Sequence, residues 1–138
     1  MAIRLLAVRE HCRRELRRKL EKHPFDPDLL EQVLDRLQQS GLQSDERFTE
    51  AFVAGRVCKG QGPLRIRAEL RERGVGSELI GRYLDRYQEA WFDLLRQVHD
   101  AKYGPGRGGG GERELAKRAR FLEYRGFPRE MIREFLLD

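Results

Sequence analysis

The sequence lacks the features of a membrane or secreted protein. It has no run of about 18 apolar residues, the length that a membrane-spanning helix requires. The first apolar segment, residues 2–8, is short and is interrupted by Arg4, so it does not have the pattern of a signal peptide. We therefore expect a cytoplasmic protein that makes no membrane contact.

Cysteine and histidine are scarce and scattered. The 138 residues include two cysteines, Cys12 and Cys58, which show neither a CxxC pair nor the Cys/His spacing of a zinc site. The three histidines, His11, His23 and His99, do not cluster with acidic or thiol partners. These spacings favour structural or incidental roles for both thiols, and we expect neither a disulfide nor a bound metal.

Motifs for catalysis are also missing. The glycine-rich segment at residues 104–111 is followed by Glu112 and lacks the Gly-Lys-Ser/Thr ending of a phosphate-binding loop, so it is better explained as a linker. No G-x-S-x-G sequence occurs. Asp45 and Glu46 are explained by helix capping more simply than by a metal pair. We expect no catalytic residues, no enzymatic activity and no cofactor.

Charged residues are abundant. They make up 37% of the chain against 39% hydrophobic residues, so each helix can have one apolar stripe, which favours an extended helical array over a thick globule. The 28 Lys and Arg exceed the 23 Asp and Glu, giving a net charge of +5 and a pI of about 9.6. This balance suits a polyanionic partner, either nucleic acid or a protein assembled on it.

Apolar residues recur at three- and four-residue steps and predict a series of helices. A first helix is expected over residues 3–21, with Leu5, Val8 and Cys12 on its apolar face. A second begins at Asp26-Pro27-Asp28 and ends at Ser40-Gly41. A third is capped by Ser44 or Asp45 and ends before residues 59–63, and a fourth opens at Pro63 or Leu64. Aromatic residues at helical spacing, such as Phe48 and Phe52, are expected in the core rather than stacked on bases.

The helical pattern repeats. Shifting the sequence by 50 residues, and then by 52 more, superimposes apolar positions such as Leu20, Leu70 and Leu122. We therefore predict an all-α fold of tandem three-helix repeats. The predicted units are a first repeat at 1–58, a second at 59–103, a flexible glycine-rich linker at 104–111, and a third repeat of two helices at 112–138.

The first helix of each unit is net basic, and the three would form a basic ridge if they lined up along the array. The segment Gly60-Gln61-Gly62-Pro63 is predicted to be a hinge that sets the angle between units, with Gly60, Gly62 and Pro63 as its main residues. A β-branched residue at Gly60 or Gly62 is expected to weaken function more than folding.

Three stretches of the sequence carry a family resemblance. They are LLAVREHCRRELRRKL at 5–20, GLQSDERFTEAFVAGRVCKGQGPLRIRAELRERGV at 41–75, and AKRARFLEYRGFPREMI at 116–132. These stretches resemble the RecX family of bacterial RecA regulators. Cys12 stands where the family more often has a serine that caps or contacts the first helix. The resemblance implies a curved, elongated fold and a monomer that binds the RecA filament on single-stranded DNA. It also implies inhibition of filament extension, strand exchange and ATP hydrolysis, and thereby modulation of DNA repair and the SOS response.

Basic residues are the predicted contacts with the RecA filament or DNA. The primary candidates are Arg56, Lys59, Arg65, Arg67, Arg71 and Arg73, followed by Arg13, Arg17, Arg118 and Arg125. Two other functions remain open at this point. Beside the RecA regulator, one alternative is a basic helical module that binds single- or double-stranded DNA directly, and the other is a helical scaffold for some other partner.

Overall fold

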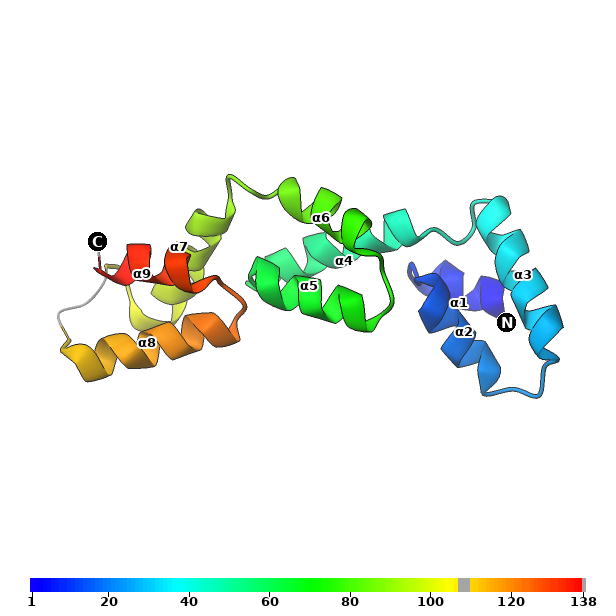
Figure 1. The fold of residues 1–138 in the computed structure, drawn as a ribbon, viewed down its shortest axis with the longest axis horizontal. Coiled ribbons are helices and arrows are strands. Elements are labelled where there is room, and N and C mark those ends of the chain that lie inside the picture. The colour runs from blue at the N-terminus through cyan, green and yellow to red at the C-terminus, as the bar shows by residue number, and fades with distance from the viewer. Residues whose placement is uncertain (107–109, 138) are drawn as a thin grey trace.

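The structure is a computed structural model that describes residues 1–106 and 110–137. Within these ranges the chain forms nine helices and no strand, which confirms the predicted all-α class (Figure 1). The helices are α1 (Ala2–Val8), α2 (Arg13–Glu21), α3 (Pro27–Gln39), α4 (Asp45–Cys58), α5 (Pro63–Glu72), α6 (Ser77–Asp85), α7 (Trp91–Tyr103), α8 (Glu112–Tyr124) and α9 (Arg129–Leu137).

Packing divides the helices into three groups of three. Helix α2 packs on α1 and α3, α4 on α5 and α6, and α7 on α8 and α9. Each group has its own apolar core, centred on Leu16 and Leu34 in the first, Ile66 and Leu70 in the second, and Leu122 in the third. The groups follow one another in an elongated row, with the chain termini in the two end groups (Figure 1).

The predicted first helix at residues 3–21 is wrong, because it is two helices. The backbone of Arg9 is extended, and Cys12 is the N-cap of a new helix, α2. The Cys12 N–H donates to Glu15 Oε1 at 3.3 Å, which satisfies a donor that a continuous helix would use internally. Val8, assigned to the apolar face, is 85% exposed because the helical spacing does not continue past it.

The packing groups begin one helix earlier than the predicted repeats. Helix α4, which we expected to close the first repeat at residue 58, packs within the second group. Helix α7, expected to close the second repeat at residue 103, packs on α8 and α9, so the last group has three helices rather than two. The predicted repeat period is correct, but a period alone does not determine which helix comes first in each unit.

The predicted linker at 104–111 joins α7 to α8 within the third group, and therefore does not separate the second repeat from the third. Its residues 107–109 lie outside the described part of the chain. Gly104, with φ of 86°, ends α7.

The second and third groups are joined end to end through their basic helices. The C-terminal end of α8 meets the N-terminal end of α5, where the Gly62 N–H donates to the Arg125 carbonyl at 2.7 Å and the Leu64 N–H donates to the Gly126 carbonyl at 2.9 Å. Donors that α5 leaves unpaired at its start are thus satisfied by acceptors from the end of α8. The aligned helix dipoles also attract each other across this joint.

A similar joint connects the first and second groups, but its hydrogen-bond donors are side chains instead of backbone N–H groups. The C-terminal end of α5 meets the N-terminal end of α2, where the Cys12 thiol donates to the Arg73 carbonyl at 3.5 Å. Arg14 Nη1 donates to the Glu72 carbonyl at 3.3 Å. Cys12 is the N-cap of α2 as Gly62 is the N-cap of α5, so equivalent positions make equivalent contacts. Helices α8, α5 and α2 therefore follow one another along the lower edge of Figure 1.

The predicted hinge joins different units from those we expected. Gly60, Gly62 and Pro63 connect α4 to α5 inside the second group, and their neighbours are in the third. A Cβ added at Gly62 would lie 2.5 Å from the Gly126 oxygen, and one at Gly60 would lie 2.6 Å from Arg125 Nη2. Close approach of backbones therefore explains these glycines, and Gly60 also has a φ of 80°.

Substituting Gly62 with alanine tests this joint. Gly62 has a φ of −84°, which alanine adopts without strain, so the effect comes from the clash with Gly126. We expect Gly62→Ala to lower the free energy of unfolding by about 1–3 kcal/mol and to speed hydrogen exchange at the Leu64 amide. Gly55→Ala, in α4 with no atom within 4 Å of the new Cβ, should be neutral or stabilising. Unchanged exchange at Leu64 would show that the joint tolerates the methyl group.

Candidate partner-binding surface

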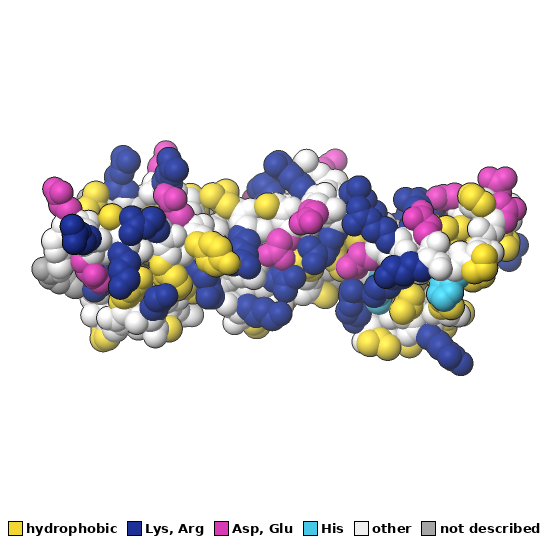
Figure 2. All heavy atoms as spheres, turned by 90° about the horizontal axis from the view of Figure 1, so that it is seen from below, with side chains coloured by type: hydrophobic (Ala, Val, Ile, Leu, Met, Phe, Trp, Pro, Cys, Tyr) yellow, Lys and Arg dark blue, Asp and Glu magenta, His cyan; other side chains and the backbone are white. Residues whose placement is uncertain are grey.

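The three basic helices, α2, α5 and α8, line up end to end along the molecule. We call their common outer face the basic ridge. Figure 2 shows Lys and Arg side chains along the whole length of the molecule on the face seen from below. The predicted contact residues divide into those that make hydrogen bonds or ion pairs within the described chain and those that make none.

Three of the predicted contacts surround one carboxylate, that of Glu69 on α5. Arg56 Nε donates to Glu69 Oε2 at 3.0 Å, and Arg65 Nε donates to Oε1 at 3.3 Å. Arg73 Nη1 lies 4.0 Å from Oε2. Arg56 and Arg73 also lie over the ring of Phe52, at 4.4 Å and 4.8 Å from its centroid. All three arginines are half-buried; Arg56 and Arg73 link α4 to α5, whereas the Arg65 pair lies within α5.

In the first group the predicted contacts pair with acidic residues of α3. Arg13 Nη2 donates to Asp35 at 2.7 Å and to Glu31 at 2.9 Å, and Arg17 Nε donates to Glu31 at 2.9 Å. The hydrogen bonds from Arg17 and then from Arg13 lower the pKa of the Glu31 carboxyl. Both guanidinium groups therefore attach α2 to α3.

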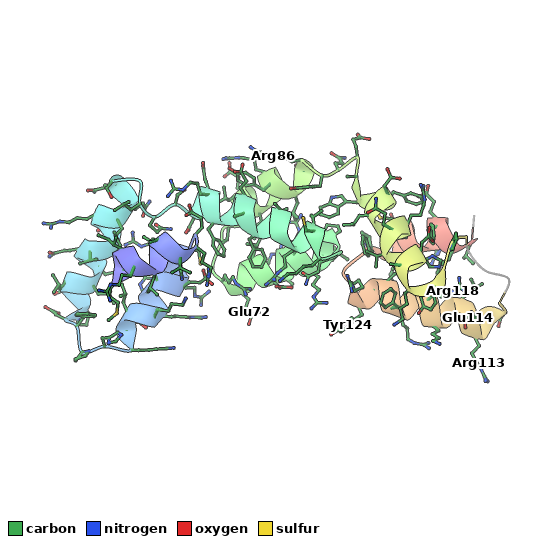
Figure 3. All side chains as sticks on the ribbon, turned by 180° about the vertical axis from the view of Figure 1, so that it is seen from behind. Glu72, Arg86, Arg113, Glu114, Arg118 and Tyr124 are labelled. Carbon is green, nitrogen blue, oxygen red and sulfur yellow. The ribbon has the colours of Figure 1, made fainter. Side chains whose placement is uncertain are left out.

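In the third group the predicted contacts also have partners. Arg118, which is 11% exposed, donates to Glu114 at 3.2 Å, and the two lie together on α8 in Figure 3, where Arg113 points away from the helix. Arg125 Nη2 donates to the Lys59 carbonyl at 2.5 Å and to the Gly60 carbonyl at 3.2 Å. Arg125 thus neutralises the C-terminal end of α4 and belongs to the joint between groups.

Lys59, Arg67 and Arg71 have side chains without a partner in the described part of the chain, and we call such side chains open; Lys59 and Arg71 are exposed, and Arg67 is half-buried. Within residues 1–106 and 110–137, these side chains make no hydrogen bond or ion pair. Arg67 and Arg71 are separated by one turn of α5 and have no acidic residue three or four positions away. Adjacent like charges on a helix are destabilising by about 0.2–0.5 kcal/mol, so an anionic partner group would stabilise this pair.

Other open cations were not among the predicted contacts. They lie on α2 and α8, are exposed, and make no ion pair in the described part of the chain: Arg18, Arg113, Lys117 and Arg120. Arg18, Lys117 and Arg120 each have an acidic residue three positions away in the sequence, so for these three the local spacing suggested pairing that the side-chain geometry does not make.

The aromatic residues behave as the helical spacing predicted. Phe48, Tyr83 and Trp91 are buried, and Phe52 packs against the second core. Tyr124, labelled in Figure 3, is instead 74% exposed at the end of α8, with the Arg65 guanidinium 5.2 Å from its ring centroid.

A buried polar cluster lies where the first group meets the second. The His11 ring accepts a hydrogen bond at Nε2 from Lys19 at 2.8 Å, because lysine can only donate. Nδ1 therefore carries the proton and donates to the Arg9 carbonyl at 3.0 Å. Burial lowers the pKa of His11, and burial raises the pKa of the neighbouring Cys12 thiol to about 11.

In the described part of the chain, no group of three or more His, Cys, Asp or Glu residues is arranged to hold a metal ion. Both cysteines are free, with Cys12 buried and Cys58 exposed. None of the described helices is both long enough and apolar enough to cross a membrane.

Three three-helix units joined end to end through basic helices define a class of tandem helical-repeat proteins. Family models for three successive domains match the chain: RecX, first three-helix domain, at residues 1–37; second three-helix domain at 44–84; and third three-helix domain at 88–136. The chain belongs to the RecX family, as its sequence motifs indicated. The matched ranges also follow the packing groups seen in the structure.

Relatives in the same family are similar over nearly the whole chain. Regulatory protein RecX of Halorhodospira halophila is 42% identical, over 96% of this chain and 81% of the relative. Regulatory protein RecX of Pseudomonas fluorescens is 44% identical, over 98% of this chain and 86% of the relative.

Two solved structures share the fold. The crystal structure of RecX from Lactobacillus salivarius has a TM-score of 0.82 at 18% identity, covering 98% of this chain and 89% of that one. A crystal structure of regulatory protein RecX has a TM-score of 0.80 at 21% identity, covering 96% of this chain and 66% of that one. At these identities the likeness shows the tandem three-helix fold.

Protonation of His11 should destabilise the fold. Because its folded pKa is lowered, the unfolded chain binds the proton more readily, and the free energy of unfolding falls as the pH drops below about 6.5. We expect His11→Gln to show a smaller loss of stability between pH 7.5 and pH 5.5 than the wild type. Urea unfolding at each pH measures this, and the difference between the two proteins removes the contribution of carboxylates common to both. Parallel pH profiles would contradict the prediction.

Proposed function

We propose that this chain regulates the RecA recombinase by binding along the filament that RecA forms on single-stranded DNA. In this proposal it suppresses filament extension, strand exchange and the coupled ATP hydrolysis, and so modulates DNA repair and the SOS response in the cytoplasm. It acts as a monomer without catalysing a reaction or binding a cofactor. Membership of the RecX family and the regulatory proteins named among its relatives support this proposal.

The observation that carries the proposal is the unpaired state of Arg67 and Arg71 at the middle of the basic ridge. Other arginines of α5 share the Glu69 carboxylate, whereas these two have no anion beside them in the described part of the chain. A chain that neutralises so many of its own arginines and leaves an adjacent pair free has a place for an external anionic group.

The length of the basic ridge explains how individually weak contacts would add up to tight binding. Exposed ion pairs contribute about 0.2–1 kcal/mol each, which is too little for one pair to hold a partner. The ridge extends over all three groups through end-to-end hydrogen bonds, so contacts on neighbouring RecA subunits would form in one binding event. Binding across subunit boundaries would then oppose the changes in subunit spacing that extension and exchange require.

The rival function is direct binding to DNA. The exposed cations of α2 and α8, such as Arg18 and Lys117, favour it because phosphate groups are the anions that such side chains meet on nucleic acid. Direct binding of this kind would be strongly salt-dependent and would not require RecA.

Charge reversal at the open pair tests the proposed function. In an assay of ATP hydrolysis by RecA assembled on single-stranded DNA, substoichiometric wild type should lower the rate. We expect Arg67→Glu/Arg71→Glu to require about tenfold more protein for half-inhibition, because two attractive contacts become repulsive. Neither side chain has a partner within the described chain, so the fold should be retained, as thermal unfolding can confirm.

A matched control changes the charge equally outside the ridge. Arg36 on α3 and Arg133 on α9 are exposed and without a partner in the described residues, and Arg36→Glu/Arg133→Glu should inhibit like the wild type. Equal loss in both double variants would mean that only net charge matters. Unchanged ATP hydrolysis with the wild type, beside tight salt-sensitive binding to naked DNA, would favour the rival function.

A further inference from the structure

A groove of about 720 Å³ lies where the second and third groups meet. Its walls come from the C-terminal end of α4, from α7 and from α8, and we call it the α4 groove. The volume is within the range of about 300–1,000 Å³ that is typical of ligand sites. Two of its lining residues, Gly60 and Arg125, also belong to the joint between the second and third groups.

The charges in the α4 groove all have one sign. Lys59, Lys102 and Arg125 line it, and no Asp or Glu is among its lining residues. The carbonyl groups that end α4 would add partial negative charge, but Arg125 donates to two of them. Lys59 also lines a second groove, at the junction of the first and second groups, so it lies between the two. The α4 groove therefore favours an anionic occupant.

The remaining lining is largely apolar. Val57, Leu94 and Phe121 are partly buried, and Ala101 is exposed beside them. Lys102 Nζ lies 4.4 Å from the Phe121 ring centroid, and Tyr103 meets the same ring edge-on at 5.7 Å. A nucleobase would have to displace the lysine in order to stack on Phe121, whereas aliphatic side chains can contact the neighbouring apolar walls directly.

We propose that the α4 groove binds an acidic amphipathic segment of a protein partner. The segment places leucine-like side chains against Val57 and Leu94 and carboxylates beside Lys59 and Lys102. This inference rests on the proposed function, which supplies a protein partner, and adds the chemistry of the segment that is recognised. It also separates two surfaces, the α4 groove for a peptide and the basic ridge for exposed anionic groups.

The native thiols provide a reporter for this site. Cys58 is exposed and lines the α4 groove, whereas Cys12 is 1% exposed and has its pKa raised to about 11. N-ethylmaleimide at pH 7.5 should therefore modify Cys58 selectively in the folded chain. An occupant of the groove would slow this modification.

The probes are three synthetic molecules: a 16-residue peptide of Glu and Leu with one acidic and one apolar helical face, a scrambled peptide of the same composition, and a 16-nucleotide oligothymidylate. We expect the amphipathic peptide, at ten times its dissociation constant, to slow Cys58 modification about tenfold. The scrambled peptide and the oligonucleotide, at the same concentration, should leave the rate nearly unchanged.

Charge reversal localises the effect. Lys59→Glu/Lys102→Glu should remove most of the protection, while Arg36→Glu/Arg133→Glu should keep it; each variant is compared with and without peptide because Lys59 adjoins the thiol. Equal protection by both peptides, stronger protection by the oligonucleotide, or no protection would overturn the inference. If the amphipathic peptide does not protect wild-type Cys58 while the wild type still inhibits RecA, this inference alone is overturned. If the amphipathic peptide protects wild-type Cys58 but the wild type does not change ATP hydrolysis by RecA, the proposed function alone is overturned.

Discussion

The structure depends on hydrogen bonds that join the end of one basic helix to the start of another. A helix leaves its first N–H groups and last carbonyl groups unpaired, and in a row of small domains these groups need partners. Here the Gly62 and Leu64 N–H groups meet carbonyls at the end of α8, and Cys12 and Arg14 meet carbonyls at the end of α5. The joints thereby align the three helices and create one continuous face from three small cores.

Acidic side chains decide which parts of that face remain available. Glu69 engages arginines from α4 and α5, and Glu31 engages two from α2. These ion pairs convert much of the positive charge into links between helices. The cations that remain open, such as Arg67 and Arg71, occupy positions that no carboxylate in the described chain reaches, so the acidic residues shape the positive surface as much as the basic ones do.

Sequence patterns predicted the class, the repeat and most helix bounds, because caps and apolar spacing are local. They failed where the deciding contact lies far away in the sequence. Residues 3–21 form two helices, and the second begins at Cys12, whose thiol contacts the Arg73 carbonyl. Helix α4 belongs to the following group because it packs on α5 and α6. For the candidate site, the sequence prediction grouped Arg67 and Arg71 with four other primary candidates, although neither has an acidic residue three or four positions away. The partners of Arg13 and Arg56 lie on other helices, so local spacing did not reveal that these side chains are engaged.

The end-to-end order of α8, α5 and α2 runs opposite to the order of the units in the chain. All three helices therefore point the same way, and the basic ridge has distinguishable leading and trailing ends. A filament assembled from identical subunits also has a direction. Two such directional objects match in one relative orientation and mismatch when either is reversed. On the proposed filament, a ridge with a direction would therefore select the orientation of the chain as well as its position.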